Sequence, residues 1–170
     1  MKMENIEQLI IPAARKGDIE VLKELMRRGA DINFQDAKGY TALIIACYND
    51  QLEAAAYLVA SGADLNIGDH GGNTALMGAA FKGYTEIAKL LIESGADINL
   101  QHGNGGTALM FAAMFGRNEV LKLLLDHGAE TGLLDIRGQH ALDLAILQGN
   151  EAGAELLELY SKNANLAKAP

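Results

Sequence analysis

Apolar and polar positions follow one pattern that returns along almost the whole chain. Between residues 69 and 101, a Gly- and Asn-containing turn comes first, a short alanine-rich apolar segment follows, and a longer amphipathic segment ends the unit. The spacing of Ile87, Leu90 and Leu91 in the longer segment is typical of a helix with one buried face. The pattern predicts two helices, about residues 75–82 and 85–94, separated by Gly83.

This pattern recurs with a constant period of 33 residues, as the helix-ending Gly29, Gly62, Gly95 and Gly128 illustrate. Two buried-type columns keep one residue through five copies: Ala13, Ala46, Ala79, Ala112, Ala145 and Leu25, Leu58, Leu91, Leu124, Leu157. A period of this length is typical of stacked-repeat proteins, in which no unit can bury its apolar face alone. Such a fold mainly offers an extended surface for binding.

The unit resembles the ankyrin repeat, in its order of turn, short helix, glycine, longer helix and Gly-Ala-Asp. The resemblance extends over about residues 3–160 and implies an all-α solenoid of stacked helix-turn-helix units with β-hairpin loops. One departure is that the family's Thr-Pro-Leu-His becomes Thr-Ala-Leu-Met in Thr74 to Met77. These simplified turns resemble bacterial members of the family more than animal ones.

The repeat boundaries predict one elongated domain with distinct end units, because terminal repeats need a polar outer face. The expected units are an N-terminal capping repeat at 1–36, internal repeats at 37–69, 70–102 and 103–135, a C-terminal capping repeat at 136–160, and a flexible tail at 161–170.

Two positions depart from their columns. Asp50 stands where the other units have glycine, so we predict a left-handed backbone there and a stability gain on Asp50→Gly. Gly153 stands where Ile87 and Val120 stand in earlier units, which predicts a weaker C-terminal helix pair.

Composition narrows the classes of partner. The net charge of −8 argues against nucleic acid and anionic membranes as partners. The single cysteine, Cys47, occupies a small-residue helix position and is expected to be a buried, inert thiol. No apolar run has the length of a membrane span, and the first residues lack the apolar core of a signal peptide. We therefore expect a cytoplasmic monomer.

No catalytic arrangement is apparent in the sequence. The segment 103–107 is glycine-rich but lacks the Gly-Lys-Ser/Thr ending of a phosphate loop. The four histidines are scattered without metal-ligand spacing, and His140 with Asp143 is interpreted as a local helix cap. We expect no catalytic residue, no metal and no cofactor, and thus no enzyme.

Binding residues follow from the resemblance, which implies partner contacts at the hairpin tips and the inner-helix ends. At the tips the predicted residues are Lys38, Tyr40, His70, Asn73, Asn104 and Arg137, and at the helix ends they are Tyr48, Phe81, Met114 and Phe115. Aromatic and Met side chains on a half-exposed face are common anchors of protein interfaces. The alternative is that these large side chains only fill the contacts between repeats.

The leading functional hypothesis is a non-catalytic protein–protein interaction module that binds an unidentified partner protein through its concave face and hairpin tips. One alternative is an enzyme or small-molecule binder that uses the concave groove. A third is a structural spacer, which would have no apolar stripe on its surface.

Overall fold

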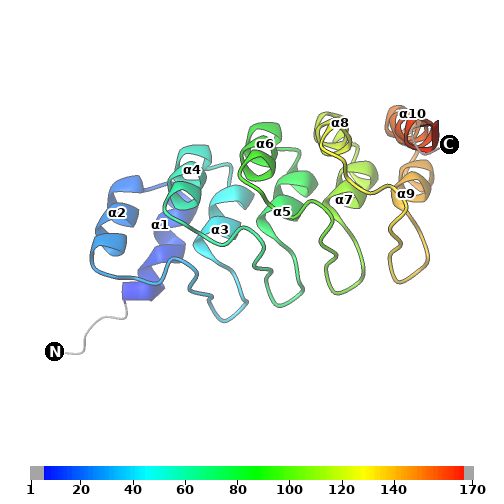
Figure 1. Cartoon of the computed structure of the whole chain (residues 1–170). Helices are drawn as coiled ribbons and strands as arrows, with labels where there is room; N and C mark the ends of the chain where they lie inside the picture. The colour runs from blue at the N-terminus through cyan, green and yellow to red at the C-terminus, as the bar shows by residue number, and fades with distance from the viewer. Residues whose placement is uncertain (1–5, 167–170) are drawn as a thin grey trace.

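The computed structural model describes residues 6–166, and in this part of the chain five helix pairs lie side by side (Figure 1). A short 3-10 helix, Ile6–Leu9, precedes them. The inner helices are α1 (Ile10–Lys16), α3 (Ala42–Tyr48), α5 (Ala75–Lys82), α7 (Ala108–Met114) and α9 (Ala141–Leu147). The outer helices are α2 (Ile19–Arg27), α4 (Leu52–Ala60), α6 (Thr85–Glu93), α8 (Asn118–Asp126) and α10 (Glu151–Leu166).

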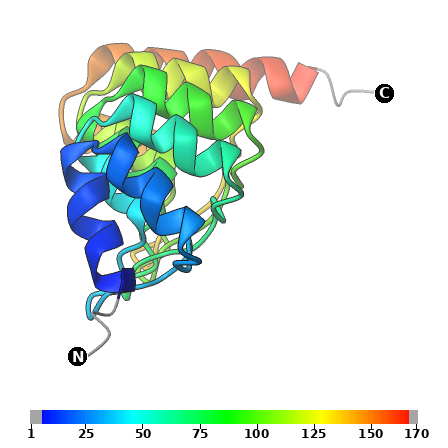
Figure 2. The same cartoon turned by 90° about the vertical axis from the view of Figure 1, so that its left-hand side faces the viewer.

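The pairs are stacked in chain order, so α1 and α10 lie at opposite ends of the stack (Figure 1). Seen from the N-terminal end, the pairs lie one behind another and the long loops leave on one side (Figure 2). Each inner helix packs on the next inner helix and on the outer helix of its own unit. This arrangement confirms the predicted all-α solenoid.

Buried threonines begin three of the inner helices. The hydroxyls of Thr41, Thr74 and Thr107 accept hydrogen bonds from the backbone N–H three residues later, at 3.1, 3.4 and 3.2 Å. Each such cap satisfies a helix-end donor and is worth about 1 kcal/mol. In the last unit His140 Nδ1 accepts from the N–H of Asp143, whose carboxylate accepts in turn from the N–H of His140. This capping box confirms the local-cap interpretation.

The core lies between the inner and the outer row of helices, and also between successive helices of the inner row. The repeated leucine column is fully buried, and the alanine columns let adjacent inner helices approach closely. Cys47 is also completely buried in such a column. Burial raises the pKa of its thiol to about 12, so the cysteine behaves as a small apolar side chain.

The long loops are hairpin turns that bond to one another along the stack. The N–H of Asp36 donates to the carbonyl of Tyr40 at 3.1 Å, and the N–H of His70 donates to the carbonyl of Lys38 in the preceding loop at 3.1 Å. No β-strand forms in the part of the chain that the structure describes, because each turn is too short to build a ladder with its neighbour. The predicted hairpin loops are therefore linked turns.

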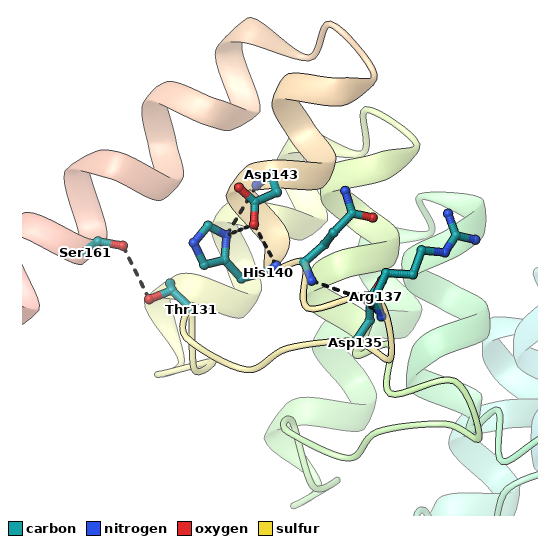
Figure 3. A network of polar contacts seen from close by, with 7 residues as sticks. Thr131, Asp135, Arg137, His140, Asp143 and Ser161 are labelled. Carbon is teal, nitrogen blue, oxygen red and sulfur yellow. Dashed lines mark hydrogen bonds and ion pairs between the residues drawn. The ribbon is translucent and has the colours of Figure 1, made fainter.

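Asp50 has a φ of 57°, which confirms the predicted left-handed backbone. At the other end, α10 continues to Leu166, so the expected boundary at residue 160 lies inside a helix. Residues 161–166 contain neither glycine nor proline to end it, and Ser161 Oγ bonds to Thr131 Oγ1 at 3.3 Å (Figure 3). Of the expected tail and N-terminal cap, residues 167–170 and 1–5 lie outside the described residues.

Gly153 has a role that its column did not indicate. It is buried, and a Cβ there would clash with the side-chain amide of Asn150 and lie 2.9 Å from Asn118 Oδ1. These two amides bond to each other at 2.9 and 3.0 Å, and Asn150 also donates to the carbonyl of Ala113 at 3.0 Å. The missing side chain thus makes room for an amide pair that joins α8 to the last unit.

Candidate binding groove

A hollow of about 440 Å³ opens between the inner helices α3, α5 and the hairpin loops. Its lining includes the mostly buried Ile44, Ile45 and Met77, together with Gly78 of α5. In the adjacent units the position of Gly78 holds Ile45 and Phe111. The hollow therefore coincides with a position at which one unit lacks the side chain that its neighbours have.

Aromatic rings form the wall of this hollow. Tyr48 and Phe81 are stacked, with ring centroids 6.3 Å apart and 9° between their planes. Phe81 also meets Phe115 edge-on at 4.7 Å and Phe111 edge-on at 6.5 Å. Tyr48 remains 43% exposed and Phe115 41% exposed. These rings both pack across repeats and face solvent, so they form a preorganised apolar stripe.

A second hollow of about 250 Å³ lies farther along the same face, between α7 and the last two loops. Met114 lines it, and so does Ile136, which is 71% exposed. Phe111 lines both hollows and carries His102 stacked on it at 5.4 Å. Because the hollows share Phe111, we treat them and the ring stripe as one groove, which we call the inner groove.

Cations surround the inner groove although the chain is acidic. Arg15 lines the first hollow, and Lys82 Nζ lies 4.5 Å above the ring centroid of Tyr48, a favourable cation–π contact. Within the inner helices the acidic residue is Asp143, which is engaged in its cap. The outer helices instead carry an acidic residue in their first turns, at one repeated position in four of them (Glu20, Glu53, Glu86 and Glu119) and one residue earlier in the fifth (Glu151).

Carboxylates in the loops hold the turns closed. Asp69 Oδ1 accepts from the backbone N–H groups of Gly71 and Asn73, at 2.8 and 2.9 Å. Asp135 does the same for its own turn, and the hydrogen bond from the backbone N–H of Gln139 lowers the pKa of that carboxyl. Figure 3 shows the side chain of Arg137 extended beyond the turn that Asp135 closes.

The structure brings most of the predicted binding residues to this groove. Those at the first hollow are Tyr40, Tyr48, Asn73 and Phe81, and those at the second are Asn104, Met114 and Arg137. Phe115 packs on Phe81 beside both. Lys38 and His70 lie exposed at the loop tips and line neither hollow.

The groove also contains residues outside the predicted set, among them Met77, Gly78 and Phe111. The signal for two of them was present in one column, where Ile45 is followed by glycine and then by phenylalanine. A repeat position that holds glycine in one unit and a large side chain in the neighbouring units indicates where a hollow can form. Side-chain conformation then decides whether the neighbours fill it.

Two kinds of feature are absent from the residues that the structure describes. No group of three or more His, Cys, Asp or Glu side chains is arranged to hold a metal ion. Within the same residues, none of the helices combines the length and apolarity required for a membrane crossing.

Comparison with known proteins gives consistent results. A family model described as ankyrin repeats, in three copies, matches residues 10–102 and 94–168. An ankyrin repeat protein of Rickettsia felis is 38% identical to the chain over 53 residues, which cover 31% of this chain and 84% of that relative.

Proposed function

This chain belongs to the ankyrin-repeat family, and from that premise we propose that it binds a partner protein in the inner groove and along the hairpin tips. Ankyrin repeats are generally protein–protein interaction modules. The observation that carries the proposal for this chain is the ring stripe of Tyr48, Phe81 and Phe115, which is held rigid by its own stacking and yet reaches solvent. Rigid aromatic groups bind with little loss of side-chain entropy.

The groove supports a protein partner better than the alternatives. A small molecule is favoured only by the size of the first hollow, which falls within the roughly 300–1,000 Å³ of ligand pockets. Of the polar groups there, Asp69 and Asn73 bond to each other within their own turn, and Asn49 and Thr74 bond to the backbone of their own helices, so these groups do not converge on the hollow. A structural spacer has no need of exposed aromatic rings.

The test is a display library of protein fragments selected on the immobilised chain, followed by hydrogen-exchange mass spectrometry of selected complexes. We expect protection of α3, α5, α7 and the loops between residues 36 and 106. The variant Phe81→Ala/Phe115→Ala should lose binding, and Leu159→Ala, which removes an exposed apolar side chain from α10, should bind normally. Protection confined to the outer helices would contradict the proposal.

Phe81 and Phe115 pack on each other, so loss of binding has to be separated from loss of fold. A circular dichroism melt of each variant serves this purpose. If the double variant unfolds at the assay temperature, Tyr48→Ala replaces it, because Tyr48 is more exposed and sits at the edge of the stripe.

A further inference from the structure

We propose that the first hollow receives one bulky apolar side chain from an extended, acidic segment of the partner. This inference rests on the proposed function and specifies the chemistry of the partner. Its support comes from three independent features: an unexplained glycine, an apolar floor and the distribution of charge.

Gly78 is not required by the backbone or by packing. It lies inside helix α5, its φ is not among the positive values of the chain, and a Cβ there would make only one ordinary contact, 3.6 Å from Tyr48 Cδ2. Alanine at such a position stabilises a helix relative to glycine. The chain therefore has a residue that makes the helix less stable at a point where a side chain would begin to fill the hollow.

The hollow is suited to an apolar group. Ile44, Ile45 and Met77 form its floor, and the Tyr48 and Phe81 rings form a wall. Its volume of about 440 Å³ is much larger than the water-sized voids that remain between closely packed helices, and it is open toward the groove. A large aliphatic or aromatic side chain entering from the groove would be buried against all of these residues.

The charges favour an acidic segment around that side chain. Arg15 lines the hollow and Lys82 lies over Tyr48, whereas Asp69, the acidic residue at the hollow, is held in hydrogen bonds with the N–H groups of its own turn. Acidic residues in the outer helices would repel the same segment from the other face. An extended conformation follows because the groove crosses several repeats and passes both hollows.

The probes are fluorescein-labelled decapeptides with Glu and Asp flanks and a central Phe, Leu, Trp or Ala, measured by fluorescence polarisation. We expect the Phe- and Leu-centred peptides to bind about tenfold or more tightly than the Ala-centred one. Peptides with Lys flanks should not bind. Because the chain contains no tryptophan, an unlabelled Trp-centred peptide adds a direct readout: its emission should shift to shorter wavelength as the ring enters the hollow.

The decisive variant is Gly78→Leu, which fills the hollow from inside. We expect it to abolish binding and the emission shift while the protein melts at the same or a higher temperature, and Gly78→Ala should retain binding. If Gly78→Leu does not fold, Gly78→Met tests the same point with a more flexible side chain. The variants Arg15→Gln and Lys82→Gln should bind the acidic peptides more weakly, and their binding should depend less on salt concentration.

The inference is overturned if Gly78→Leu binds the peptides as tightly as the parent protein does. It is also overturned if the Ala-centred peptide binds as tightly as the Phe- and Leu-centred ones, or if no probe binds up to about 1 mM. The proposed function is judged separately. If selected fragments protect the groove but carry neither acidic flanks nor a bulky apolar residue, the function stands and this inference fails. If no fragment protects the groove, both fail.

Discussion

Asp50 offers the sharpest test of how local backbone conformation limits the stability of this chain. It follows the last residues of α3 with a φ of 57°, whereas the equivalent positions in other units are glycines with φ between 67° and 81°. Its side chain is exposed. The substitution Asp50→Gly should therefore remove backbone strain without disturbing any packing.

Three contributions set the magnitude. A left-handed backbone costs an ordinary L-residue about 1–2 kcal/mol, and somewhat less for aspartate, whose short polar side chain tolerates it. A carboxylate beside a helix C-terminus costs a further 0.3–1 kcal/mol, approximately, because it faces the negative end of the dipole. Against these gains, glycine gives the unfolded chain more conformational freedom, which lowers the free energy of unfolding by about 0.4–1 kcal/mol. We expect Asp50→Gly to stabilise the protein by about 1 kcal/mol, which raises Tm by about 2–4 °C at this size.

Urea denaturation followed by circular dichroism, together with a thermal melt, measures the effect. Asp50→Asn separates its two sources, because asparagine keeps the side-chain shape and removes the charge. Gly116→Ala is the matched control: its φ is 67° and a Cβ there meets nothing within 4 Å, so its cost is backbone strain alone. We expect that variant to lose about 1 kcal/mol.

A lower Tm for Asp50→Gly would refute the reasoning. A neutral result for both Asp50→Gly and Gly116→Ala would show that the chain relaxes at these turns without cost. Equal gains for Asp50→Gly and Asp50→Asn would assign the whole effect to charge and none to the backbone.

Three further predictions concern other parts of the stack. Hydrogen bonding by the backbone N–H of Gln139 lowers the pKa of Asp135 below its ordinary 3.8, so its contribution to stability is complete above that value and disappears as the pH falls through the lower folded pKa. The urea midpoint of Asp135→Ala should therefore lie below that of the parent at neutral pH and converge with it in strong acid; a constant gap would be inconsistent. Gly153→Ala should cost about 1–3 kcal/mol in a urea titration, because its Cβ displaces the amide of Asn150, and a stabilised variant would disprove that role. The Cys47 thiol, with its pKa raised to about 12 by burial, should react with a thiol reagent only as fast as the protein opens, so rapid labelling of the folded chain would contradict its burial.

Much of the fold could be predicted from the sequence because its determinants are local. Threonine caps, helix-ending glycines and columns of leucine and alanine act within one unit and recur in the next. The left-handed backbone at Asp50 was predictable for the same reason. The continuation of α10 past residue 160 was missed, although residues 161–166 contain no glycine or proline to end it; the contact of Ser161 with Thr131, which joins the helix to the preceding unit, is visible only in the fold.

The repeating residue pattern is enough to establish that this chain is a row of helix pairs, since neither half of a pair can bury its apolar residues without the neighbouring unit. Where that row is hollow, and which rings surround the opening, follows from packing between units. The first hollow depends on side chains from four successive units and on one that is missing, at Gly78, and no single unit contains that information. The same holds for Gly153, whose lack of a side chain has meaning only beside the amides that fill its place.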